Sequence, residues 1–191
     1  MRKVFLFITM SFDGYIAGPK NELDWMAAGD DPENTDDIVA LLSGSDTGLM
    51  GYPTAVGMIP YWSSAVNNPA TPKSEMAIAQ AISKIHSIVI SNTEEKLDFD
   101  NADLLVVKND HDLIDAVSRL KRQPGRDMGI PGGVRTAQKF ARLGLVDEYV
   151  IQVQPVAIGS GKPLFTSRVD LKLVSAKTYK TGVMWVRYKP R

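Results

Sequence analysis

Strand-like and helix-like segments alternate along most of this chain of 191 residues, and the alternation limits the folds that it can adopt. Short apolar or β-branched runs predict strands at 4–10, 47–51, 87–90, 104–107, 127–130 and 148–156. Apolar residues at helical spacing predict helices at 74–85 and 110–120, and signals at the helix ends predict two more at 34–42 and 133–143. Two alternating runs joined by a glycine turn predict a C-terminal hairpin at 171–178 and 183–188. This order indicates an α/β sheet with parallel pairs and an antiparallel edge.

Local signals suggest where several of these elements begin and end. Asn34 is the predicted N-cap of the first helix, with two acidic residues in its first turn. Asp110 or Asp112 is the predicted N-cap of the helix that ends near residue 120. The segment 52–72 holds four prolines, so we expect an irregular connection with a helical turn there.

The length of the chain and its balance of charges limit the classes of protein to which it can belong. A chain of this length is close to the usual size of one domain, so we expect a single domain over residues 1–191. Lys and Arg together number 22 and so do Asp and Glu, which gives no support to a nucleic-acid or anionic-membrane partner. The apolar run 4–10 is too short to span a bilayer, and a buried first strand explains it better than a signal peptide.

The absence of cysteine excludes disulfides, cysteine nucleophiles and thiolate metal sites. It also fits a cytoplasmic protein, which is the location that we expect. The two histidines, His86 and His111, have no second ligand at useful spacing, so we expect no metal site.

A double glycine lies between a predicted strand and a predicted helix, in the run Gly129-Ile-Pro-Gly-Gly-Val-Arg-Thr136. Glycine lets the backbone approach a bound group closely, and the free N–H groups of a helix's first turn attract an anion. The pyrophosphate of a dinucleotide would suit this position. The alternative is a plain glycine turn, because short glycine motifs often occur without a ligand.

Three segments around this motif occur in an order typical of one family. They are 120–134, 143–149 and 155–165. Together they closely resemble the reductase domain of the bifunctional riboflavin-biosynthesis deaminase–reductase and its stand-alone dihydrofolate-reductase-like relatives. The run 11–17 resembles the opening of the same family, and Leu49-Met-Gly51 resembles the end of its second strand. The resemblance covers nearly the whole chain and implies a three-layer α/β/α fold with a central mixed sheet of about eight strands.

The same resemblance implies a function. It implies an enzyme that uses NADPH or NADH to reduce a small heterocyclic substrate, pterin-like or ribosylaminopyrimidine-like, by hydride transfer from the nicotinamide. The deaminase half of the bifunctional enzyme needs a zinc site with a Pro-Cys-x-x-Cys run, so a chain without cysteine is not that enzyme. The alternative is a non-catalytic protein that binds a small molecule or nucleotide and has lost the cofactor grip.

The family resemblance carries cofactor roles to three groups of positions. The pyrophosphate group comprises Gly132, Gly133, Val134, Arg135 and Thr136. The group expected against the nicotinamide comprises Thr9, Ile16 and Ala17. The phosphate group comprises Gly51, Tyr52, Thr54, Ser91, Asn92 and Thr93. For Ile16 and Ala17, ordinary strand packing is the alternative explanation.

Two positions depart from the family pattern. Tyr52 and Asn92 stand where the family usually has arginines, which would grip the extra phosphate of NADPH. Losing two charge-assisted contacts of about 1.5–3 kcal/mol each would weaken the preference for NADPH. Either NADH is accepted, or Arg135, Lys73 or another residue substitutes, or the site no longer serves a nicotinamide cofactor.

Candidates for proton transfer and substrate binding are less specific. Asp36 and Asp37 lie near the position of the helix-borne acid of folate-reducing members, although acids in a first turn also stabilise a helix dipole. Asp13 is a second candidate, although Asp-Gly usually makes a turn. Trp25 could stack on a flat heterocycle or cover the core. The family often forms dimers, so a homodimer through the apolar strand from Tyr149 to Val156 is a further expectation.

Overall fold

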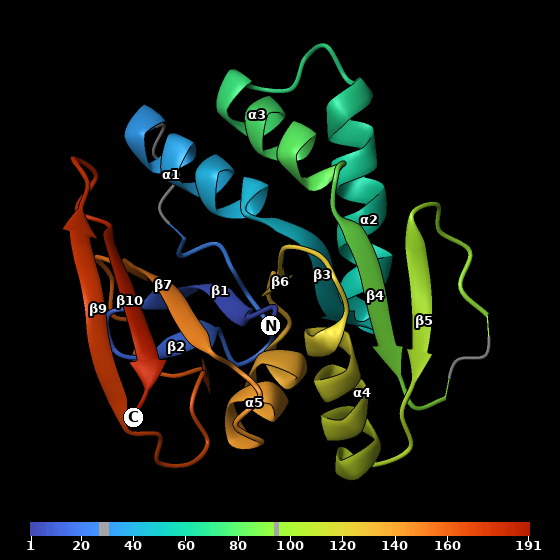
Figure 1. Cartoon of the computed structure of the whole chain (residues 1–191). Helices are drawn as coiled ribbons and strands as arrows, with labels where there is room; N and C mark the ends of the chain where they lie inside the picture. Colours follow the sequence, from blue (N-terminus) through green and yellow to red (C-terminus); the bar gives the residue numbers. More distant parts are fainter. Residues whose placement is uncertain (27–30, 94–95) are drawn as a thin grey trace. The chain divides into compact units, whose positions relative to one another are not determined.

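The computed structural model describes residues 1–26, 31–93 and 96–191, and the chain divides into two compact units (Figure 1). The first unit comprises Met1–Lys3 and Pro32–Gly129, and the second comprises Val4–Asp31 and Ile130–Arg191. The second unit therefore combines a segment near the N-terminus with the C-terminal part of the chain. Eight strands belong to the main sheet, and the two units hold four each.

The first unit is built from parallel strands with helical crossovers. Its strands follow the order β5-β4-β3-β6, and every neighbouring pair is parallel. They are β3 (Ser45–Gly51), β4 (His86–Ser91), β5 (Ala102–Val106) and β6 (Asp127–Ile130). Parallel neighbours need crossover connections, and helices lie in the connections from β3 to β4 and from β5 to β6. The helices are α1 (Pro32–Ser43), α2 (Tyr52–Asn67), α3 (Lys73–Ile82) and α4 (Asp110–Arg122).

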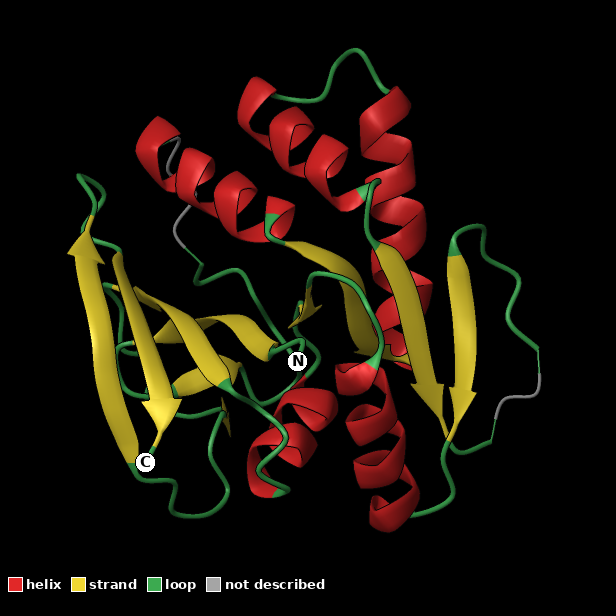
Figure 2. Cartoon of the chain, viewed as in Figure 1, coloured by secondary structure: helices red, strands yellow, loops and turns green. Residues whose placement is uncertain are grey.

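The second unit carries the antiparallel edge. Its strands follow the order β1-β7-β10-β9, where β1 and β7 are parallel and the remaining pairs are antiparallel (Figure 2). They are β1 (Val4–Ser11), β7 (Glu148–Gln154), β9 (Leu171–Thr178) and β10 (Met184–Pro190). Two very short strands, β2 (Tyr15–Ala17) and β8 (Lys162–Pro163), form a separate antiparallel pair. One helix, α5 (Val134–Arg142), completes the unit.

The predicted strands, helices and C-terminal hairpin are all present within a few residues of their expected bounds. Strand β7 is buried along its whole length and pairs with β1 on one side and β10 on the other. Its edges are therefore not open for pairing with a second copy. The strand at the open edge is β9, where Leu173 is 52% exposed and Val174 is 48% exposed. A homodimer remains a prediction, but β7 cannot form it by edge pairing.

The segment 52–72 is more regular than expected, because Tyr52–Asn67 forms a helix of 16 residues. Pro53 lies in the first turn, where its missing N–H costs nothing, and Pro60 removes only one backbone hydrogen bond. Burial of Ala55 and Ala65 against the rest of the unit offsets that loss. The proline count overstated the disruption because only one of the four prolines lies in the helix beyond its first turn.

Two predicted N-caps are wrong. Helix α1 begins at Pro32, so Asn34 lies inside it and the two aspartates that follow are past its first turn. Proline is favoured at the first helical position because its missing donor would be unsatisfied there anyway. Helix α4 is capped by Asn109, whose side chain accepts a hydrogen bond from the N–H of Asp112 at 3.0 Å. Asp110 and Asp112 are instead its first-turn acids.

The start of edge strand β5 is tied to β4 through one histidine. The ring nitrogens of His86 lie 3.0 Å from Asn101 Oδ1 and 2.9 Å from Asp103 Oδ2. The hydrogen bond with Asn101, with help from Asp103, raises the pKa of His86 above 6.5 even though partial burial opposes the shift. A raised pKa in the folded state means that the imidazolium stabilises the fold below its unfolded pKa, and that this contribution disappears as pH rises through the folded value.

We therefore expect the stabilising effect of His86 to be larger at about pH 5.5 than at about pH 8. Urea unfolding at several pH values should show that the gap in unfolding free energy between the native protein and His86→Gln narrows as pH rises. His111→Gln is the matched control, because the chain has two histidines and His111 is exposed on α4. A gap for His86→Gln that does not change with pH would show that protonation of His86 does not contribute to stability.

Candidate functional site

The start of α5 is the predicted pyrophosphate position, and two glycines precede it. Gly132 and Gly133 both have positive φ, at 136° and 82°, which other residues rarely adopt. Gly133 is the N-cap, and no side chain of the described residues caps this end. A Cβ at Gly132 would meet nothing within 4 Å, so the backbone here faces open space. The first N–H groups of α5 are therefore available to a negatively charged group.

A short chain of contacts joins α5 to the residues expected near a nicotinamide. Gln138 of α5 donates a hydrogen bond to the carbonyl of Pro163 at 2.7 Å. Pro163 belongs to β8, which pairs with β2 so that Ala17 lies opposite Lys162. Ile16 and Ala17 of β2 are buried. The predicted pyrophosphate and nicotinamide residues are thus in one unit and linked through β8.

Thr9 lies on β1 in register with a buried glutamine of β7. Its hydroxyl is 3.4 Å from Oε1 of Gln152, and Gln152 is 6% exposed. Gln154, two residues on along the same face, is 5% exposed. Buried amides in an otherwise apolar strand are costly unless they are hydrogen-bonded. Neither glutamine was predicted from the sequence as a site residue. The signal that could have identified them is the presence of two glutamines in a long, mostly apolar strand.

Asp13 is exposed, and its carboxylate is already engaged by its own chain. Ser11 Oγ donates to it at 2.6 Å, and the backbone N–H groups of Ile158 and Gly159 donate at 3.2 and 2.8 Å. The Ser11 hydroxyl and the two N–H groups hold the pKa of Asp13 below its usual 3.8, against a smaller opposing effect of burial. The predicted substrate contact remains a prediction, and the contacts in the structure indicate a structural role.

Trp25, the other predicted substrate residue, is half-buried, and its indole N–H donates to the Glu22 carbonyl at 3.0 Å. The indole is therefore tied to its own loop at one edge. Its faces are not involved in that bond, so stacking on a heterocycle remains a prediction.

The predicted phosphate residues lie in the first unit, at the carboxyl ends of β3 and β4. Gly51 is the N-cap of α2, with Thr54 in the first turn of that helix. Tyr52 packs against an apolar cluster that contains Met50 and Val89, so it contributes to the core of the unit. Neither an acidic residue in the first turn nor a side-chain cap is found at this end of α2 in the described chain. This end can therefore also favour an anion.

The second phosphate position has a cation close to it that sequence reasoning missed. Ser91 ends β4, and its hydroxyl accepts the N–H of Thr93 at 3.2 Å. Asn92 and Thr93 are exposed. The ammonium group of Lys108, which follows the end of β5, lies 3.4 Å from the Asn92 carbonyl. The position of Lys108 just after a predicted strand was a signal for this contact. Strands β4 and β5 are parallel neighbours, so residues just past their carboxyl ends lie close together.

Asp36 and Asp37, the predicted proton donors, are in the first unit on α1. Asp36 is exposed and Asp37 is half-buried. Tyr149 is a poor alternative acid, because burial raises its pKa to about 12. The role of the two aspartates stays a prediction.

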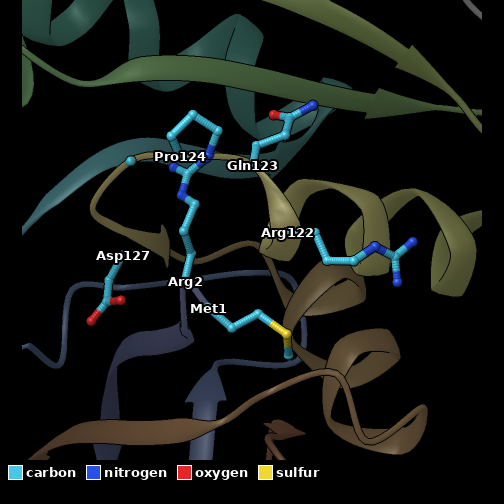
Figure 3. A pocket seen from close by; sticks show the side chains of 7 residues that line it. Met1, Arg2, Arg122, Gln123, Pro124 and Asp127 are labelled. Atoms are coloured by element: carbon cyan, nitrogen blue, oxygen red, sulfur yellow. The ribbon is translucent and has the colours of Figure 1, made fainter.

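A polar hollow of about 700 Å³ occurs elsewhere in the first unit, around Arg2 and Arg122 (Figure 3). It lies at the amino ends of β3 and β6, whereas ligands of parallel α/β sheets bind at the carboxyl ends. The Arg2 guanidinium is directed to Asp46 and Thr47, and is buried. Burial raises the pKa of Asp46, but the Arg126 N–H, Thr47 and Arg2 more than offset this and hold it below 3.8. These contacts indicate a structural ion pair.

No group of three or more histidine or acidic side chains able to hold a metal occurs in ranges 1–26, 31–93 and 96–191. Across the same ranges, no helix has the length and apolar character needed to cross a membrane.

Comparison with known proteins gives a match that spans both units. The family model of the RibD C-terminal domain matches residues 2–185. The uncharacterized Bacillus subtilis (strain 168) protein YyaP is 30% identical over 190 residues, which cover 98% of this chain and 94% of YyaP. Among solved structures, a Shewanella sp. PV-4 protein named for riboflavin biosynthesis is 26% identical, with a TM-score of 0.73 and coverage of 99% of both chains.

A dihydrofolate reductase is also similar in fold. The Enterococcus faecalis enzyme, in complex with NADP(H), has a TM-score of 0.61 and 10% identity, and the match covers 99% of this chain and 96% of the enzyme. At this identity the likeness shows the fold alone. The predicted dihydrofolate-reductase-like α/β fold with a mixed main sheet is confirmed, as is the resemblance to stand-alone relatives of the riboflavin reductase domain.

The open start of α5 predicts a charge-specific effect at Thr136, in its first turn. Thr136→Asp should weaken binding of NADPH or NADH by about tenfold or more, because a carboxylate competes with the nucleotide for the same N–H groups. Helix stability should not fall, since acids are favourable in a first turn. The measurement is calorimetric titration alongside urea unfolding. Thr136→Asn is the neutral control of the same size, and an equal loss in both variants would contradict an anion site.

Proposed function

Because the chain belongs to the RibD C-terminal domain family, we propose that it is an NAD(P)H-dependent reductase of a small heterocyclic substrate. The proposed substrate is pterin-like or ribosylaminopyrimidine-like. One observation carries the proposal: the uncapped start of α5 at Gly133 is linked through β8 to the buried Ile16 and Ala17 of β2. This arrangement offers an anion site and an apolar wall within the same unit.

The residues of this unit fit a nicotinamide dinucleotide. The N–H groups that follow Gly132 and Gly133 would hold the pyrophosphate, because no side chain of the described residues caps them and the space beside Gly132 is open. Ile16 and Ala17, which protein atoms already cover, would form the apolar backing of the nicotinamide position and keep water away from it. Bound NADPH or NADH would supply the hydride. Placing the substrate beside it in the right orientation would account for much of the rate enhancement.

The proton is the second requirement of the reaction. We propose that Asp36 or Asp37, or a water molecule, delivers it to the substrate. Thr9 and Gln152 would contribute polar contacts near the carboxyl ends of β1 and β7, since a hydroxyl and an amide can both donate and accept hydrogen bonds to a heterocycle.

Lys108 is our candidate to replace the arginines that the family usually has at the positions of Tyr52 and Asn92. We infer that its ammonium group, beside Asn92, supplies a cation for a phosphate group that binds at this end of the first unit. A lysine binds a phosphate as a point charge and lacks the fork of an arginine, so the preference for NADPH over NADH should be modest.

A second candidate is a nucleotide-binding protein without reductase activity. The observation that favours it is Tyr52, which packs into the apolar cluster of the first unit where the family usually has a phosphate-binding arginine. The two candidates differ in hydride transfer. Only the reductase will oxidise a bound nicotinamide in the presence of a pterin or aminopyrimidine acceptor.

The primary test is calorimetric titration of the purified protein with NADPH and with NADH. We expect a dissociation constant below about 1 mM for at least one of them, within the usual range for metabolite sites. If neither nucleotide binds in that range, the reductase proposal is wrong.

The role of Lys108 gives a separate prediction. Lys108→Met should lower NADPH affinity about three- to fivefold and leave NADH affinity unchanged, as expected for one exposed ionic contact. Lys84→Met is the matched control, because Lys84 is also exposed but precedes the amino end of β4. Equal losses for both nucleotides, or the same loss in Lys84→Met, would assign the phosphate contact elsewhere.

A further inference from the structure

Asp13 joins two segments that are far apart in the sequence. It lies in the turn between β1 and β2, and two of its three hydrogen-bond donors are the N–H groups of Ile158 and Gly159 in the loop after β7. The third donor is Ser11, whose side chain is fully buried and also accepts the N–H of Tyr15 at 3.0 Å. One buried hydroxyl therefore orients the carboxylate and the start of β2 together.

The two segments remain in contact on both sides of this carboxylate. The N–H of Phe12 donates to the Val156 carbonyl at 2.7 Å, and the N–H of Leu164 donates to the Gly14 carbonyl at 3.4 Å. Beyond Asp13, a Cβ at Gly161 would lie 2.3 Å from the carbonyl oxygen of Ala17. The loop backbone thus follows the β1–β2 turn closely, and the position of Ala17 depends on where the loop lies.

We propose that Asp13 is a positioning residue, which fixes Ile16 and Ala17 against the nicotinamide by holding the loop at Ile158 and Gly159. The inference rests on the proposed function, because it assigns the nicotinamide to this wall. It changes the role of Asp13 from a substrate contact to a support for the cofactor site. The carboxylate acts through β2 and does not itself touch the reacting atoms.

A carboxylate suits this role better than an amide would. All three groups that face it are donors, and an ionised carboxylate only accepts, with two oxygens available. An asparagine would offer one oxygen and turn an NH₂ group toward another donor. Asp13→Asn should therefore lose part of the contact, and Asp13→Ala should lose all of it.

Hydrogen–deuterium exchange tests whether Asp13 holds the loop at Ile158 and Gly159. Exchange at Ile158 and Gly159 should be about tenfold faster in Asp13→Ala, with an intermediate rate in Asp13→Asn, because these amides lose their acceptor. Asp170→Asn is the matched control, since Asp170 is an exposed acid of the same unit that pairs with Arg168. Unchanged exchange in Asp13→Ala would overturn the inference.

The binding of two nucleotides then tests whether this contact of Asp13 positions Ile16 and Ala17 against the nicotinamide. NADH carries the nicotinamide, whereas ADP-ribose carries the same pyrophosphate without it. Asp13→Ala should lower the affinity for NADH by about tenfold relative to the affinity for ADP-ribose. Asp13→Asn should lower it by less. General damage to the fold would lower the affinity for both ligands equally, and that result would overturn the inference.

The remaining outcomes separate this inference from the proposed function. If the native protein binds neither NADPH nor NADH, the proposed function fails and the inference fails with it. If the native protein binds NADH and the amides open in Asp13→Ala without any change in the NADH to ADP-ribose ratio, the positioning role is wrong and the proposed function stands.

Discussion

The pairing of β2 with β8 determines the geometry of the candidate site in the second unit. These strands have three and two residues, too few to hold their place through backbone hydrogen bonds alone. Their contact depends on a glycine at position 161, because any side chain there would collide with the carbonyl of Ala17. Gln138 anchors β8 to α5 from one side, and Asp13 holds the preceding loop from the other. The anion site and the apolar wall are linked through this single pair.

Uncapped helix starts are the electrostatic feature that the candidate positions share, and each unit has its own. The start of α5 presents N–H groups behind two glycines, and the start of α2 follows a glycine N-cap. Such groups are fixed by the helices and need no side-chain ordering when an anion binds. The cation that we assign to the phosphate, Lys108, is exposed and flexible by comparison. This balance explains why binding of a dinucleotide is expected to survive the loss of the arginines, while discrimination between NADPH and NADH is expected to weaken.

The sequence predicted the order of elements because each strand or helix carries its own periodic pattern. The double glycine at a strand-to-helix junction also led to the proposed anion site, which stays a prediction. The sequence did not predict β2 and β8, because two or three residues show no periodicity. Nor did it predict that α2 is a helix, because the effect of Pro53 and Pro60 depends on their position in the helix and on the packing around Ala55. Lys108 and the contacts of Asp13 come from residues distant in the chain, and only the fold brings them together.

The central claim is that the start of α5 and strand β2 receive a nicotinamide dinucleotide. An NMR titration of the amide resonances of the ¹⁵N-labelled protein with NADPH, followed by NADH, tests this claim most directly. The account predicts that the largest shifts fall on Gly132, Gly133 and Val134, with a second group on Ile16 and Ala17. Shifts confined to the hollow around Arg2 and Arg122, or no shifts at millimolar nucleotide, would contradict it.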